Sequence, residues 1–198
     1  NDFWTSVISG CKMAAEEYES DLEILAPDKE ENIEEQNKLL KKAIEQKPDA
    51  ILFSPSSMDA SDELLKEAKE KGIHTVIDTA GGPFTREEPF FSKFQELMKY
   101  TDLLLVDIKH IDTECHKTLT GRSNENILDM IRYLSDIKKP IWIRHVLVPE
   151  RSDKDEYLTR LADFIHSLDN VEKVEILPYH TMGIYKWKEL GLEYPLEG

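Results

Sequence analysis

The sequence has 198 residues, enough to bury the core of one domain or of two small ones. Its 25 Lys and Arg residues stand against 40 Asp and Glu residues, a formal net charge of −15. This balance argues against a nucleic acid or an anionic membrane as a partner, because the chain lacks a basic stripe to neutralise phosphates. No apolar run reaches the length of a membrane span, and we expect no membrane partner.

The first part of the chain alternates between helical and strand patterns. Apolar residues at helical spacing, from Phe3 to Ala14, predict the first helix. A turn is expected over 54–57, where Ser and Pro follow a short apolar run. In order, we predict a helix over 2–18, a strand over 22–26, a helix over 32–46, a strand over 50–53 and a helix over 62–71.

The alternation continues to the end of the chain. We predict strands over 74–77, 103–108, 141–147 and 173–177, and helices over 90–98, 126–137, 154–168 and 185–190. Continuous apolar strands between amphipathic helices are typical of a parallel sheet with right-handed crossovers. The predicted fold class is therefore α/β, with about six parallel strands and flanking helices. Periodicity does not decide whether the sheet is open or partly closed into a barrel.

Three blocks in the second part resemble one family. They are LLLVDIKHID (103–112), WIRHVLVP (142–149) and ILPYHTMGIYKWKELGLEYPLEG (176–198). These blocks are similar to pyruvate formate-lyase activating enzyme, a radical S-adenosylmethionine (SAM) activase of glycyl-radical enzymes with a partial TIM barrel. The resemblance covers residues 73–198 and implies a [4Fe–4S] cluster on three neighbouring cysteines, together with SAM. This chain has only Cys11 and Cys115, far apart, so we expect neither cofactor to be used.

The resemblance also implies a set of site residues. Asp78, Thr79 and Asp107 match positions that bind a monovalent cation beside the SAM carboxylate, and oxygen ligands suit such an ion. Lys109 matches a lysine that approaches SAM. Arg144 and His180 match further positions that face the cofactor. Ala80 departs from the family pattern, and the Gly-Gly-Glu-Pro segment that holds the SAM amino group is absent. We therefore expect these residues to form the remnant of a SAM and cation pocket.

The first part of the chain resembles a different family. The stretches NDFW (1–4), EENIEEQNKLLKKAIEQKPDAILFSPSS (30–57) and LLKEAKEKGI (64–73) are similar to the N-terminal lobe of periplasmic sugar-binding proteins, which is flavodoxin-like. The resemblance implies that Phe3 and Trp4 stack on a sugar ring, with 54–57 at the opposite wall. The alternative is that Phe3 and Trp4 are simply the hydrophobic end of the first helix.

The two resemblances meet at Gly72. This predicts a periplasmic-binding-protein-like segment over 1–72 and an activase-like half-barrel over 73–198, in one continuous α/β domain. We interpret the chain as an engineered chimera, expressed in the cytoplasm, that is not an enzyme and has no natural activity. The alternative is a module that binds SAM or another small ligand. In both interpretations, the SAM pocket and the sugar-binding site lack parts that their chemistry needs.

Two further expectations concern the sheet and a possible metal site. A sheet without a strand before residue 1 must pair its strands in sequential order, or else cover an exposed edge by forming a homodimer. His110, Cys115 and His116 lie near Asp112, but their spacing matches no zinc pattern. We therefore expect no metal site there and predict a solvated loop.

Overall fold

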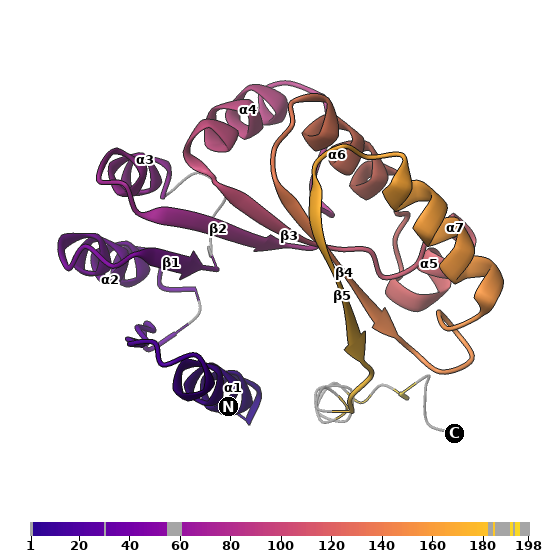
Figure 1. Ribbon diagram of the computed structural model, residues 1–198, viewed down its shortest axis with the longest axis horizontal. Coiled ribbons are helices and arrows are strands. Elements are labelled where there is room, and N and C mark those ends of the chain that lie inside the picture. The colour runs from indigo at the N-terminus through magenta and orange to yellow at the C-terminus, as the bar shows by residue number, and fades with distance from the viewer. Residues whose placement is uncertain are drawn as a thin grey trace. The chain divides into compact units, whose positions relative to one another are not determined.

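The computed structural model describes residues 2–29, 31–54, 61–181, 184, 191, 193 and 194. The chain divides into two compact units, each described here by itself: Asn1–Ala26 with Tyr179–Gly198, and Pro27–Pro178. The first unit contains helix α1 (Asp2–Glu17), as predicted (Figure 1). Among the described residues, no helix combines the length and the apolar character that crossing a membrane requires.

The second unit is a five-stranded parallel sheet with the strand order β1-β2-β3-β4-β5. Helices α3, α4, α6 and α7 run along one side of this sheet (Figure 1). The α/β class, the parallel sheet and the sequential order of the strands are confirmed. The elements are α2 (Ile33–Glu45), β1 (Ala50–Phe53), α3 (Asp62–Glu70), β2 (His74–Thr79), α4 (Phe90–Tyr100), β3 (Leu103–Asp107), α5 (Thr113–Thr120), α6 (Glu125–Asp136), β4 (Ile141–Leu147), α7 (Asp155–His166) and β5 (Val171–Pro178).

Side-chain caps define where two of the helices begin. The Asn32 side chain accepts a hydrogen bond from the Glu35 backbone N–H at 3.1 Å and donates from Nδ2 to the Glu35 carboxylate at 2.9 Å. The first of these bonds satisfies the Glu35 N–H, which lacks a partner inside α2, and the second holds the Asn32 side chain in its capping position. Helix α5, which periodicity did not predict, is capped by Asp112, whose side chain accepts hydrogen bonds from the Glu114 and Cys115 N–H groups, and Gly121 follows its last residue. The cap and the glycine were the available sequence signals for it.

The expected strand over 22–26 is wrong. Residues 21–27 have no regular secondary structure, and Leu22 and Ile24 are exposed. A strand is stable only when a neighbouring strand takes up its backbone hydrogen bonds, and the sheet of the second unit begins at β1. The sheet therefore has five strands where about six were expected. The predicted helix over 185–190 and most of the predicted turn over 54–57 lie outside the described residues.

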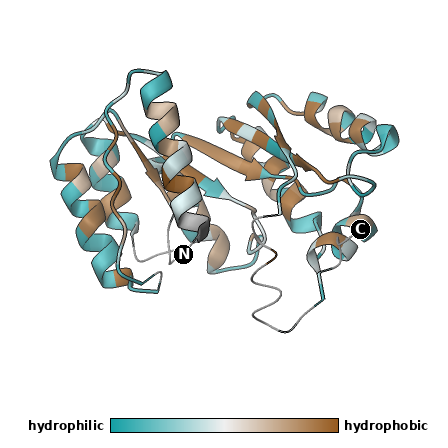
Figure 2. Ribbon diagram, turned by 90° about the horizontal axis from the view of Figure 1, so that it is seen from below, coloured by the Kyte–Doolittle hydropathy of each residue, from teal (hydrophilic) through white to brown (hydrophobic). Residues whose placement is uncertain are grey.

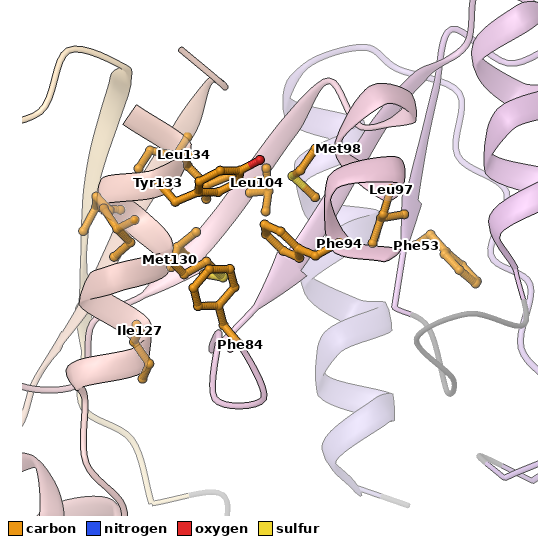
Figure 3. Packing of buried hydrophobic residues seen from close by; sticks show 14 of the residues in the cluster. Phe53, Phe84, Phe94, Leu97, Met98, Leu104, Ile127, Met130, Tyr133 and Leu134 are labelled. Atoms are coloured by element: carbon orange, nitrogen blue, oxygen red, sulfur yellow. The ribbon is translucent and has the colours of Figure 1, made fainter. Parts of the chain in front are cut away.

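The core of the second unit lies between the sheet and its helices. Alternation along each strand sends Leu104, Val106, Ile141 and Ile143 to the helix side, where all are buried. Figure 2 shows the resulting colouring, with strongly hydrophobic strands and helices that carry both kinds of residue. Aromatic rings join the loop after β2 to α4 in this core: Phe84 of the loop and Phe94 of α4 meet edge to face, with ring centroids 5.1 Å apart (Figure 3).

Candidate functional site

The strands β2, β3 and β4 bring charged residues together at their carboxyl ends. Asp78 lies opposite Leu105 in the sheet register, and Asp107 lies opposite Arg144. Asp107 and Arg144 alternate with the buried residues of their strands, so they occupy the sheet face opposite α3, α4, α6 and α7, which we call the uncovered face within the second unit. In parallel α/β sheets, sites form at this end of the strands because the carboxyl ends meet at one edge.

Four residues form a continuous ion-pair network, which we call the charged edge: Asp78, Asp107, Lys109 and Arg144. Arg144 Nε donates to Asp107 Oδ1 at 3.1 Å, and Arg144 Nη2 donates to Asp78 Oδ1. Lys109 Nζ donates to the other oxygen of Asp107 at 2.8 Å. The structure therefore joins four of the six SAM-site positions expected from the sequence. Two carboxylates balance two cations, so the network is formally neutral.

The members of the charged edge differ in their access to solvent. The side chains of Asp107 and Arg144 are 14% and 19% exposed, whereas those of Lys109 and Asp78 are 36% and 38% exposed. Partial burial nevertheless raises the pKa of Asp78, and the nearby negative charge of Asp107 acts in the same direction. The Arg144 guanidinium opposes this rise. Lys109 and Asp78 are therefore the groups of the charged edge that are most available to a ligand.

Thr79 follows Asp78 but faces its own loop. The Thr79 hydroxyl accepts a hydrogen bond from the Gly81 N–H at 3.0 Å. Gly81 lies against Met130 of α6 so closely that a Cβ at this position would come within 2.6 Å of the Met130 methyl carbon. The loop after β2 is thus packed onto α6, and Thr79 is placed beside the charged edge without joining its ion pairs.

Sequence reasoning missed the residues that anchor this loop and those that extend the charged edge. Arg86 donates two hydrogen bonds to Asp129 of α6, at 2.8 and 2.9 Å. On the other side of the edge, Glu175 of β5 lies opposite Arg144, and its carboxylate pairs with Lys173 at 2.7 Å. Alternation along β5 could have placed Lys173 and Glu175 on the uncovered face. No local pattern links Arg86 to Asp129.

The other predicted site residues are not part of the charged edge as described. His180 is exposed and belongs to the first unit. Phe3 and Trp4 lie within α1, and their side chains lie outside the described residues. Ser54 is described, and its carbonyl accepts a hydrogen bond from the Gln36 side chain at 3.1 Å. Sugar stacking by Phe3 and Trp4 therefore stays a prediction.

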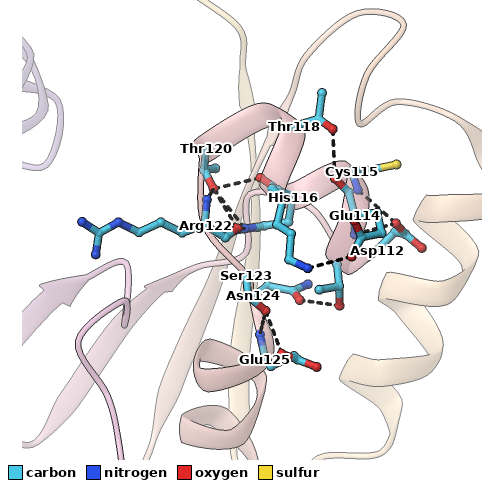
Figure 4. A network of polar contacts seen from close by, with 12 residues as sticks. Asp112, Glu114, Cys115, His116, Thr118, Thr120, Arg122, Ser123, Asn124 and Glu125 are labelled. Carbon is cyan, nitrogen blue, oxygen red and sulfur yellow. Dashed lines mark hydrogen bonds and ion pairs between the residues drawn. The ribbon is translucent and has the colours of Figure 1, made fainter.

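The segment around Asp112 is ordered, so the expected solvated loop is wrong. His110 and His116 are buried, and residues 113–120 form α5. The Asp112 carboxylate accepts hydrogen bonds from the Glu114 and Cys115 backbone N–H groups at 3.1 and 3.0 Å (Figure 4). Its capping role contributes to this order, because a side-chain partner for these N–H groups stabilises the start of the helix.

The residues of this chain do not fit an iron–sulfur cluster. A [4Fe–4S] cluster of the activase type needs three neighbouring thiolates, whereas the sequence contains only Cys11 and Cys115. These two cysteines belong to different compact units. In the described ranges, no group of three or more His, Cys, Asp and Glu residues is arranged to hold a metal ion.

Comparisons with known proteins identify two sources of similarity. A family model for the periplasmic binding protein domain matches residues 1–87. Pyruvate formate-lyase-activating enzyme from Listeria monocytogenes is 54% identical over 136 residues, which are 69% of this chain and 55% of that protein. The protein of the same name from Staphylococcus epidermidis is 56% identical over 136 residues, 69% of this chain and 54% of its own length. The chain spans about half the length of these curated relatives.

A solved structure supports the fold. It is a domain of pyruvate-formate lyase-activating enzyme from Bacteroides vulgatus, with a TM-score of 0.57 and 24% sequence identity. The match covers 72% of this chain and 95% of that domain. The α/β arrangement of parallel strands and flanking helices is therefore shared, and the two sequence similarities are consistent with a composite of two sources.

The similarity to natural activases overturns two expectations. An identity of 54–56% over 136 residues contradicts the interpretation of the chain as an engineered scaffold without natural activity. It also contradicts the expectation that the chain is not an enzyme. Both expectations gave the missing cysteines more weight than the matched blocks, although the region similar to the activases covers 69% of the chain.

Proposed function

We propose that the chain has an activase-like function in which the charged edge binds the amino-acid end of SAM. The main support for this proposal is the identity of 54% over 136 residues with pyruvate formate-lyase-activating enzyme. All four residues of the charged edge match the activase blocks. The ion pairs among them supply a surface of carboxylates and cations, as the charged groups of SAM require.

The charged edge is complementary to the two ends of an amino acid. SAM carries an α-ammonium group and an α-carboxylate, which need an acceptor and a donor respectively. Asp78 is the more exposed of the two carboxylates and accepts the ammonium group. Lys109 has one carboxylate partner at 2.8 Å, so its ammonium can turn toward the ligand carboxylate. Arg144 holds both aspartates in place.

The residues of this chain bind SAM but supply no radical chemistry of their own. When bound, an iron–sulfur cluster would supply the electron for radical chemistry, but the residues here provide no three-thiolate site. The residues of this chain bind and orient SAM at the carboxyl ends of β2, β3 and β4.

We also propose that the two sequence sources join near Gly72, which gives segments 1–72 and 73–198.

Calorimetric titration with SAM tests the proposed site. We expect the wild-type protein to bind SAM and Lys109→Met to weaken binding by about tenfold or more, because a hydrogen bond to a charged group contributes about 1.5–3 kcal/mol. The matched control is Lys117→Met on α5, since Lys117 also has a carboxylate partner at 2.8 Å. This variant should bind SAM as the wild type does.

A second ligand separates the amino-acid end from the rest of SAM. Methylthioadenosine keeps the adenosine and the sulfur but has no ammonium or carboxylate group. It should bind more weakly than SAM to the wild type and equally to Lys109→Met and wild type. A flat SAM titration of the wild type, or equal SAM affinities for Lys109→Met and wild type, would show that the charged edge is not the site.

A further inference from the structure

The second unit contains a cavity of about 170 Å³, partly open to solvent, on the helix side of the sheet. Its walls include Phe53 of β1, Leu65 of α3, and Phe94 and Leu97 of α4, which are all buried. Figure 3 shows Phe53, Phe94 and Leu97 among the neighbouring core side chains. Protein interiors seldom leave spaces much larger than a water molecule, so a space of about 170 Å³ is unusual in a core of this size.

The two walls of the cavity come from the two sides of Gly72 in the sequence. Phe53 and Leu65 precede Gly72, whereas Phe94, Leu97 and Leu104 follow it. On the second side, Phe84 and Phe94 pack edge to face at the wall of the cavity. The space therefore lies where side chains from two sequence segments face each other and do not fill the volume between them.

Three polar residues at the rim of the cavity, Ser61, Thr79 and Asp78, already have partners. Ser61 Oγ donates to Asn37 Oδ1 at 2.7 Å, and Thr79 Oγ1 accepts from the Gly81 N–H at 3.0 Å. Asp78 is bound by Arg144. A ligand in the cavity would thus gain little from polar groups of its own, and burying a charge among aromatic and aliphatic walls is costly.

We propose that this cavity binds one small apolar molecule of about the size of benzene. A cavity of about 150 Å³ lined by Leu, Ile and Phe side chains stays free of water and takes up benzene. The cavity in this protein has a similar volume and mainly apolar walls. The inference does not rest on the proposed SAM site, because the apolar walls of the cavity lie on the helix side of the sheet. Asp78, which also belongs to the charged edge, lies only at the rim.

Methyl resonances can report on occupancy directly. Met98 and Met130 both line the cavity, so their ε-methyl groups, labelled with ¹³C, will sense the ring current of bound benzene. Addition of benzene to the full chain should shift both methyl signals in a saturable way and raise the midpoint of thermal unfolding, since a ligand that binds only the folded state stabilises it. Benzoate, which has the same ring and a charge, should do neither.

Cavity-filling variants complete the test. Leu65→Phe and Leu97→Phe each place a ring in the space, so each should abolish the benzene response. Leu161→Phe is the control, because Leu161 is buried in α7 away from the cavity walls and its substitution should leave the response intact. If the filled variants do not fold, the contrast between benzene and benzoate in the wild type decides. No saturable shift with benzene, an equal response to benzoate, or a response that survives in folded Leu65→Phe and Leu97→Phe would overturn the proposal.

Discussion

Arg144 of β4 lies directly opposite Asp107 of β3, and its Nε donates to Asp107 Oδ1 at 3.1 Å. The same guanidinium reaches Asp78 of β2, which is 66 residues away in the sequence. One side chain therefore connects the carboxyl ends of three adjacent strands. Because the guanidinium is planar and presents several donors, it can serve both carboxylates at once, which a lysine ammonium does less well.

Arg144→Ala should destabilise the protein by about 1–3 kcal/mol. The substitution leaves Asp107, whose side chain is 14% exposed, and Asp78 without the guanidinium that offsets their partial burial. Urea unfolding of the two proteins measures the difference in the free energy of unfolding. NMR titration should also show a further rise in the pKa of Asp78, because Arg144 holds that pKa down.

The matched control for this prediction is Arg160→Ala. Arg160 also binds an aspartate, Asp112, at 3.1 Å, but its side chain is 45% exposed. Ion pairs in contact with solvent contribute about 0.2–1 kcal/mol, so this variant should lose less stability than Arg144→Ala. Equal losses for the two variants would mean that the position of Arg144 at the strand ends has no special structural importance.

Asp112 should make the stability of the protein depend on pH under acidic conditions. The Cys115 backbone N–H, followed by Arg160, lowers the pKa of Asp112 to about 2. Its value in the unfolded chain is about 3.9, so its contribution is present above that pH and is lost as the pH falls toward 2. Asn at this position still caps the helix but does not titrate. The difference in free energy of unfolding between wild type and Asp112→Asn should therefore shrink from about pH 5 to about pH 2.

The measurement for Asp112 is urea unfolding of both proteins at several pH values in this range. Subtracting the unfolding free energy of Asp112→Asn from that of the wild type cancels the contributions of the other carboxylates, provided that the substitution does not change their pKa values. A difference that stays constant over the range would show that the Asp112 carboxylate has the same pKa in the folded and unfolded states.

Gly121→Ala should cost about 1–2 kcal/mol through the backbone alone. Gly121 has a φ of +78°, a conformation that places the Cβ of other residues too close to the following carbonyl group. No atom lies within 4 Å of an added Cβ, so steric contact with other residues does not contribute. Gly10→Ala within α1 is the matched control. No atom lies within 4 Å of an added Cβ at Gly10, and its φ is not positive. This variant should therefore stabilise the protein by about 0.5–1 kcal/mol. Thermal unfolding compares the two, and a Gly121→Ala protein as stable as wild type contradicts the prediction.

Elements that depend on local sequence signals were predicted correctly, whereas features that depend on residues far apart in the sequence were not. The bounds of β1 and β4 agree with the structure because short apolar runs with β-branched residues, ended by turn residues, are local signals. Residues 22–26 show the same kind of run but form no strand, because strand formation also needs a partner. Within the candidate site, four of the six residues expected to face SAM proved to be joined, whereas Glu175 and the Arg86–Asp129 pair were missed.

The sequence by itself determined the α/β class, most helices and strands, and the lack of a three-cysteine cluster site within this chain, since these depend on residue identity and on spacing along the chain. Only the tertiary structure decided that Arg144 bridges two aspartates and that side chains on either side of Gly72 leave a cavity between them. The physical reason is that both features arise from the register of neighbouring strands and from the packing of helices on the sheet. These are relationships between residues far apart in sequence, on which local periodicity carries no information.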